Sequence, residues 1–165
     1  MRPPEPDWQF TIWETIRSAL IVGRCSLLLG VVLLFFLPIS LAFPKRAYDP
    51  WLRATARLLL RCAGISCTVK GLENIDPEEP YILTPNHVNM LDPFIYQAYF
   101  PKLLRGLEKK ENFAIPIWGR WMRAVGQLEI DRENPRKALE SMRNVARTIH
   151  EDKTSVMVAP EGTRT

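Results

Sequence analysis

Hydrophobic positions form one long block near the N-terminus and short runs along the rest of the chain. No charged residue occurs from Cys25 to Pro44, where the sequence reads CSLLLGVVLLFFLPISLAFP. A run of this length can cross a hydrocarbon core of about 30 Å as a helix. Pro38 near its end predicts a kink, or a helix that turns back before crossing. A buried core helix is the alternative, but a helix that is apolar on every face is hard to enclose in a small domain.

Basic side chains dominate the segment directly after this block, namely Lys45, Arg46, Arg53, Arg57 and Arg61 against the single acid Asp49. The first 43 residues carry equal numbers of basic and acidic side chains, so the formal net charge of +4 lies entirely after them. Excess Lys and Arg beside a membrane segment predicts that this side faces the cytoplasm and anionic lipid. Residues Trp51 to Cys62 are expected to form a basic amphipathic helix whose leucines enter the interface: Leu52, Leu58, Leu59 and Leu60.

Beyond Gly64, short strands are expected to alternate with helices. The predicted strands are Ser66–Lys70, Tyr81–Leu83, Leu128–Ile130 and Ser155–Ala159. The predicted helices run from Asp92-Pro93 to Phe100 and from Asn134-Pro135 to His150. This alternation predicts an α/β sheet with its functional loops gathered at strand ends. The intervening segment Lys102–Arg123 mixes aromatic and basic residues, which beside a membrane anchor favours a lipid interface over single-stranded nucleic acid.

The chain length of 165 residues fits one domain with an appended anchor. We divide it into an N-terminal tail (1–17), a membrane anchor with the basic helix (18–62) and a globular domain (63–165). Three cysteines, Cys25, Cys62 and Cys67, lack metal or redox spacing and are assigned to packing. No metal site is therefore expected.

Candidate chemistry centres on His87 and Asp92, which flank a turn between a predicted strand and a predicted helix. Asp92 is expected to cap the helix, with Pro93 at the first helical position. The turn can fold His87 back towards Asp92, whose carboxylate would fix the imidazole tautomer. For such a pair alone, a capped helix beside a surface histidine is the commoner explanation.

Two further segments change this balance. Gly126–Arg132 and Pro160–Arg164 also end strand-like runs, so the chain contains NHxxxxD, GxxxIDR and PEGTR in that order. Together these motifs resemble the glycerolipid acyltransferase family, and most of all its 1-acyl-sn-glycerol-3-phosphate (lysophosphatidic acid) acyltransferases. The resemblance runs from about Tyr48 to the last residue. It implies a central mixed sheet flanked by helices, as in glycerol-3-phosphate acyltransferases, and a catalytic domain that is incomplete at its C-terminal end.

The residues support acyl transfer to an alcohol. A neutral imidazole, with a reference pKa of about 6.5, allows His87 to act as general base, oriented by Asp92. No nucleophile elbow such as GxSxG is present, so direct attack by the substrate hydroxyl is favoured over an acyl-enzyme. Arg132 and Arg164 suit a phosphate monoester. The resemblance adds four residues to substrate binding: Asn86, Glu161, Gly162 and Thr163.

The resulting hypothesis is a membrane enzyme of phospholipid biosynthesis with its catalytic domain on the cytoplasmic side. It would move a fatty acyl group from acyl-CoA or acyl-carrier protein to the sn-2 hydroxyl of lysophosphatidic acid, giving phosphatidic acid. No bound cofactor and no nucleic acid are expected, and membrane lipids are expected partners. Another lysophospholipid or glycerol 3-phosphate stays open as acceptor, because four residues beside the motifs depart from the family pattern: Val88, Asn89, Glu129 and Ala159. A non-catalytic lipid-binding protein is the alternative from another class.

Overall fold

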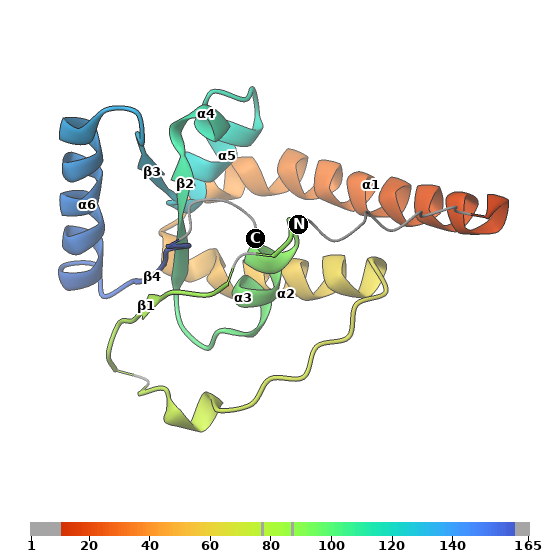
Figure 1. The fold of residues 1–165 in the computed structure, drawn as a ribbon, viewed down its shortest axis with the longest axis horizontal. Coiled ribbons are helices and arrows are strands. Elements are labelled where there is room, and N and C mark those ends of the chain that lie inside the picture. Colours follow the sequence, from red (N-terminus) through yellow and green to blue (C-terminus); the bar gives the residue numbers. More distant parts are fainter. Residues whose placement is uncertain (1–10, 77, 87, 161–165) are drawn as a thin grey trace, which may run out of the picture.

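The computed structural model describes residues 11–76, 78–86 and 88–160 of the chain. Its elements in chain order are α1 (Ile12–Ala42), α2 (Lys45–Cys62), the 3-10 helix η1 (Leu72–Asn74), β1 (Ile82–Leu83), α3 (Asp92–Tyr99), β2 (Leu104–Lys109), α4 (Lys110–Phe113), α5 (Trp118–Val125), β3 (Leu128–Ile130), α6 (Pro135–His150) and β4 (Ser155–Met157). Figure 1 shows α6 on one side of the strands, with α1 and α2 on the other.

The apolar block forms α1, which begins earlier than the expected anchor boundary at residue 18. A capping box explains the start: the Glu14 amide donates to Thr11 Oγ1 (3.3 Å), and the Thr11 amide donates to Glu14 Oε2 (2.8 Å). Pro38 lies within the helix and does not end it. Within the described residues, α1 is the one helix that is long and apolar enough to cross a membrane, which suggests membrane association.

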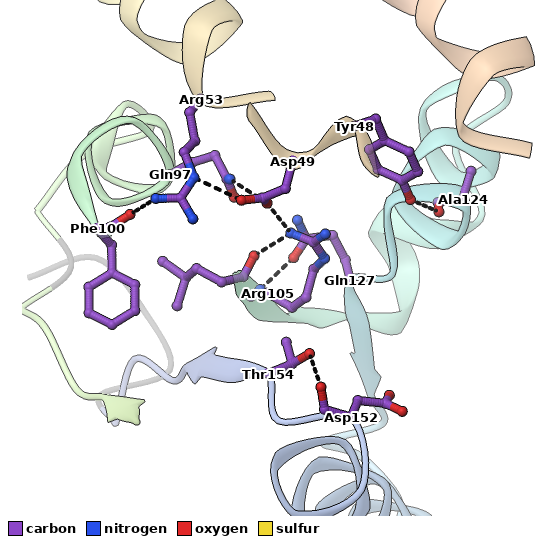
Figure 2. Close-up of polar contacts among 12 residues, drawn as sticks. Tyr48, Asp49, Arg53, Gln97, Phe100, Arg105, Ala124, Gln127, Asp152 and Thr154 are labelled. Carbon is purple, nitrogen blue, oxygen red and sulfur yellow. Dashed lines mark hydrogen bonds and ion pairs between the residues drawn. The ribbon is translucent and has the colours of Figure 1, made fainter. Parts of the chain in front are cut away.

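The C-terminal half of α1 is joined to the rest of the protein. Phe36 packs with Tyr48, Leu52 and Val125 in a buried cluster, and its ring meets the Tyr48 ring edge-on at 5.5 Å between centroids. The Tyr48 hydroxyl donates to the Ala124 carbonyl at 2.8 Å (Figure 2). The N-terminal half of α1 projects away from the body (Figure 1). The N-terminal half of α1 is therefore apolar and exposed, whereas its C-terminal half contributes to the core.

The leucines of α2 do not serve as predicted. Leu52, Leu59 and Leu60 are buried in the protein, so the expectation that they enter a membrane interface is wrong, whereas Leu58 is exposed. The physical reason is that α2 packs along α3, where Leu60 and Ala98 belong to a second buried cluster. The amphipathic pattern of α2 thus marks a core face.

Two arginines of α2 are likewise bound within the protein. Arg53 donates to the Phe100 carbonyl, and Arg57 Nε donates to the Ala98 carbonyl at 3.0 Å. These carbonyls lie at the C-terminal end of α3, where the helix leaves acceptors unpaired and carries partial negative charge. Arg53 and Arg57 therefore attach α2 to α3.

The four strands form one sheet in the order β1-β4-β2-β3, and all three described strand pairs are parallel. The expected α/β class is confirmed, but the antiparallel component of a mixed sheet is absent from the described residues. The cause is connectivity: α3, the α4–α5 pair and α6 each occupy one connection between successive strands. A crossover of this kind returns the chain in the same direction.

Local predictions varied in accuracy. Strand β3 and helix α6 have the predicted bounds, and the Asn134 side chain caps α6 by accepting from the amides of Arg136 and Lys137. Strand β4 ends at Met157, two residues early. Residues Ser66–Lys70 form no strand, because this segment is unpaired and Cys67 packs against the α2–α3 cluster instead. Strand β2 was not predicted at all.

A buried polar cluster joins α2, α3 and β2 (Figure 2). Arg105 on β2 is only 1% exposed, and its Nη1 donates to Asp49 Oδ1 on α2 at 3.2 Å. Asp49 also accepts from Arg53 Nε at 2.8 Å and from Gln97 Nε2 at 3.4 Å. These contacts fix the helices that lie beside the sheet edge described next.

Candidate active site

Each of the three sequence motifs contains or follows one strand of the same parallel sheet. β1 leads into the Asn86–Asp92 segment, β3 leads into Asp131-Arg132, and β4 leads towards Pro160. Because the strands run in parallel, their carboxyl ends lie at one edge of the sheet. Three segments that are far apart in the sequence therefore start from a common edge.

This edge is stepped. Leu83, Met157 and Gly106 share one row across β1, β4 and β2, whereas Ile130 of β3 pairs with Lys109. From Gly106 to Lys109 is three residues, or about 10 Å along a strand. The turn after β3 therefore begins farther along the strand direction than the segment after β1.

Asp92 holds the turn before α3, but it does so differently from the prediction. The carboxylate oxygen Oδ2 accepts from the amides of Val88 (2.7 Å) and Asn89 (2.9 Å), and Asp92 is only 7% exposed. Asp92 is the first residue of α3, Leu91 occupies the cap position, and no side chain caps this helix. The expected helix cap is thus wrong: the carboxylate points back and closes the preceding turn.

Several predicted site residues lie outside the described part of the chain. These are His87, Glu161, Gly162, Thr163 and Arg164. The structure places their flanking residues: Asn86 is exposed after β1, and Val158 is attached to β1 by a 2.8 Å hydrogen bond from its amide to the Leu83 carbonyl. The assignments of the undescribed residues stay predictions.

The turn after β3 is highly organised. Asp131 Oδ1 accepts from the amides of Glu133 (3.1 Å) and Asn134 (3.2 Å) and from Lys110 Nζ (3.0 Å). Hydrogen bonding by Lys110 lowers the pKa of Asp131, and the same contact raises the pKa of Lys110. Arg132 lies exposed within this turn. Arg132 therefore lies at the sheet edge in a turn that is held by hydrogen bonds.

Two lysines at this edge were missed by the sequence analysis. Lys109 ends β2 opposite Ile130 and is exposed, and Lys110 is the first residue of α4. The signal was weak because β2 contains Arg105 and Glu108 and therefore lacks a continuous apolar run. Only the pairing of β2 with β3 and β4 brings these cations to the motif segments.

Two hollows lie near the edge. A cavity of about 40 Å³ between α3 and the sheet is lined by Pro93, Gln97, Leu104, Gly106, Glu108, Gln127 and Met157. It has room for water but not for a lipid chain, since ligand pockets measure about 300–1,000 Å³. A larger open pocket of about 380 Å³ lies on the α4–α5 segment, lined by Phe113, Ala114, Ile115, Pro116, Ile117, Arg120 and Arg123.

The turn between α4 and α5 depends on a glycine. A Cβ atom at Gly119 would lie 2.0 Å from the Phe113 carbonyl oxygen, so no other residue fits there without moving the backbone. Arg123 Nη1 donates to the same carbonyl at 3.0 Å. The pocket on this segment is thus built on a fixed hairpin of two short helices.

Within residues 11–76, 78–86 and 88–160, no group of three His, Cys, Asp or Glu side chains is placed to hold a metal.

Comparison with known proteins places this geometry in a family. A model of the acyltransferase family matches residues 66–165. A 1-acyl-sn-glycerol-3-phosphate acyltransferase from Cocos nucifera is 29% identical over 173 residues, which cover 99% of this chain and 55% of the relative. One of the same name from Pseudomonas aeruginosa is 29% identical over 154 residues, covering 92% of this chain and 59% of the relative.

A solved structure has the same fold. The crystal structure of the 1-acyl-sn-glycerophosphate (LPA) acyltransferase PlsC from Thermotoga maritima matches with a TM-score of 0.72 and 18% identity, covering 92% of this chain and 63% of that chain. The chain spans a little more than half the length of the two curated relatives. Since the family model matches more than half of the chain, and the motif order had already indicated it, this protein belongs to the acyltransferase family.

Proposed function

We propose that this chain belongs to a membrane-associated enzyme that acylates the sn-2 hydroxyl of 1-acylglycerol 3-phosphate, giving phosphatidic acid. The observation that carries the proposal is the common sheet edge at which β1, β3 and β4 end, each next to one of the three motifs in the sequence. Family membership supports the reaction class, and the names of the relatives support the acceptor.

In the proposed reaction, His87 takes the proton of the acceptor hydroxyl while the hydroxyl oxygen attacks the thioester carbonyl. An ester C–O bond forms, the C–S bond breaks, and the proton passes from His87 to the departing thiolate. Asp92 orients His87 and stabilises its protonated form. The two backbone amides on Asp92 Oδ2 support this role, because they fix the position of the carboxylate in the turn before α3.

The acceptor phosphate is assigned to cations at the same edge. Arg132 and Arg164 would bind it through paired N–H groups, with Lys109 as a third positive charge. The pairing of Lys109 with Ile130 supports this arrangement, since it brings the end of β2 next to the turn that carries Arg132. Asn86, Glu161, Gly162 and Thr163 complete the proposed substrate site. The acyl donor is either acyl-CoA or acyl-carrier protein, and the proposed reaction uses no bound cofactor.

Membrane association suits an enzyme whose acceptor and product are lipids. The exposed apolar length of α1 supports insertion, and Ile115 and Ile117 expose further apolar surface at the pocket on the α4–α5 segment. The excess of Lys and Arg after α1 supports a catalytic domain on the cytoplasmic side. The excess of Lys and Arg sets the orientation while the chain inserts into the membrane. The contacts that Arg53 and Arg57 make after folding therefore do not affect it.

The test is acyl transfer by the full chain in detergent, supplied with acyl-CoA or acyl-carrier protein and a panel of acceptors. The panel contains lysophosphatidic acid, lysophospholipids with larger head groups, and glycerol 3-phosphate. We expect phosphatidic acid from lysophosphatidic acid and none from a His87→Ala control. Binding of these lipids without any ester product would show a non-catalytic lipid-binding protein and overturn the proposal.

A further inference from the structure

Lys110 lies where the ends of β2 and β3 meet. It directly follows β2, Asp131 directly follows β3, and the preceding residues Lys109 and Ile130 are paired in the sheet. Lys110 Nζ lies 3.0 Å from Asp131 Oδ1 and 3.1 Å from Glu133 Oε2. One ammonium group therefore contacts both acids that flank Arg132.

The turn around Arg132 is closed by the same acid. Asp131 Oδ1 accepts from the backbone amides of Glu133 and Asn134, and the Asn134 side chain in turn accepts from the first amides of α6. Asp131 Oδ1 thus accepts hydrogen bonds from two backbone amides and one ammonium group, and these bonds hold the conformation of the turn. Loss of the ammonium group would loosen the backbone that carries Arg132.

Charge gives Lys110 a second effect. Asp131 adjoins Arg132, so its negative charge would oppose any phosphate that Arg132 binds. Lys110 offsets this charge at 3.0 Å. Hydrogen bonding between the two groups lowers the pKa of Asp131 and raises the pKa of Lys110, so both stay charged at neutral pH.

From this geometry we propose that Lys110 is a positioning residue for the acceptor phosphate: it holds the turn that presents Arg132 and neutralises Asp131 beside it. The inference rests on the proposed function, in which Arg132 binds the phosphate. It predicts that Lys110 governs the affinity for a phosphorylated acceptor, without touching the acyl donor or the reacting atoms.

The kinetic test uses the full chain with Lys110→Met, Lys110→Arg and the double variant Lys110→Met/Asp131→Asn. Lys110→Met should raise KM for lysophosphatidic acid about tenfold, the scale of one charge-assisted contact, and change kcat and donor KM by less than about twofold. Lys110→Arg should restore most of the affinity. The double variant should lose less than Lys110→Met, because the opposing charge is gone while the amide oxygen still closes the turn.

The matched control is Lys137→Met, which removes an exposed lysine of α6 close to the same turn and should leave both KM values unchanged. A second readout is hydrogen exchange of the Glu133 and Asn134 amides, which should accelerate in Lys110→Met and stay slow in Lys110→Arg. This readout needs no turnover and reports directly on the turn.

The outcomes separate the two proposals. If the wild-type chain makes phosphatidic acid but Lys110→Met changes acceptor KM no more than Lys137→Met does, the inference is wrong and the proposed function stands. An equal rise in both KM values, or unchanged amide exchange, would also overturn it. If the wild-type chain neither binds nor acylates lysophosphatidic acid, both proposals fail.

Discussion

Arg105 on β2 and Asp49 on α2 form a buried ion pair, with 3.2 Å between Nη1 and Oδ1. The residues are 56 positions apart in the sequence, and their contact joins α2 to β2, the strand that ends at Lys109 (Figure 2). Burial lowers the pKa of Arg105, and the charge of Asp49 opposes that shift. Nε and Nη2 of Arg105 have no hydrogen-bond partner within the described residues. Asp49 is therefore the counter-charge on which this guanidinium depends.

Removing the two partners should have unequal effects. Asp49→Leu leaves a buried guanidinium without its carboxylate and should destabilise the protein by about 3–5 kcal/mol. Arg105→Met should destabilise it by clearly less, because Asp49 keeps Arg53 and Gln97 as partners. The double variant should melt above Asp49→Leu. Thermal melts in detergent check this order, and equal melting temperatures for the two single variants would contradict it.

Membrane binding should depend on a stripe of exposed leucines on α1. Leu20, Leu27 and Leu34 recur every seven residues and are 66%, 71% and 70% exposed. Changing all three to Asn removes roughly 1.5–3 kcal/mol of apolar transfer each, and should release the protein from vesicles in a flotation assay. Phe36→Ala is the control: it should lower the melting temperature, because Phe36 is buried, without releasing the protein. Unchanged flotation of the triple variant would count against α1 as the anchor.

Substitutions at His87 and Asp92 should distinguish a loss of catalysis from a loss of stability. His87→Ala should lower kcat by roughly 10²–10⁴-fold, the usual contribution of a general base, with little change in melting temperature. Asp92→Asn should also lower kcat, since its oxygen can keep both amide contacts while the charge is lost. Asp92→Ala should in addition destabilise the protein by about 1.5–3 kcal/mol, because the turn loses its acceptor. Wild-type turnover by His87→Ala would disprove the mechanism.

Arg132 should contribute to acceptor binding and not to donor binding. Arg132→Ala is expected to raise KM for lysophosphatidic acid roughly ten- to a hundredfold, as for the loss of a bidentate contact of about 1.5–3 kcal/mol. Arg132→Lys should recover part of this loss, since it restores charge but not the planar fork. Arg136→Ala, at the second residue of α6, is the control. Steady-state kinetics with each substrate varied separately give the answer, and a matching rise in donor KM would refute the assignment.

The Lys110–Asp131 pair predicts a defined pH window. Asp131 has a pKa below its ordinary value of 3.8, so its contribution is present above that pH and is lost as pH falls through the lowered pKa. Lys110 has a pKa above 10.5, so its contribution is present below that pH and is lost as pH rises through the raised pKa. The difference in melting temperature between wild type and Lys110→Met should therefore be constant from about pH 5 to 9 and shrink below pH 3.8. A steady decline between pH 5 and 9 would exclude this pair as its source.

The sequence by itself determined the features that depend on neighbouring residues. Asn134-Pro135 gave the start of α6, because a side-chain cap and a fixed proline φ act within one turn. The uncharged run after Arg24 identified α1, and three ordered motifs identified the family. Each of these signals consists of residue types in their order along the chain, so no knowledge of distant contacts was needed.

The tertiary structure decided which faces are buried. The leucines of α2 fit a membrane interface and a protein core equally well. An amphipathic pattern shows that one face of the helix contacts apolar surroundings, but it does not show whether these are lipid or protein. Only the packing of Leu60 against Ala98 resolves this. Strand β2 escaped detection for the same reason: Arg105 is buried only because Asp49, far away in the sequence, neutralises it.

The tertiary structure also decided how the site is assembled. The chain order of the strands does not give the sheet order β1-β4-β2-β3, which depends on hydrogen bonds between strands up to 75 residues apart, such as that from the Val156 amide to the Tyr81 carbonyl. The carboxylate of Asp92 could cap α3 or close the preceding turn, and local sequence permits both. The structure shows it on the amides of Val88 and Asn89. A motif specifies which groups are available, whereas their directions follow from contacts that form only when the whole sheet is in place.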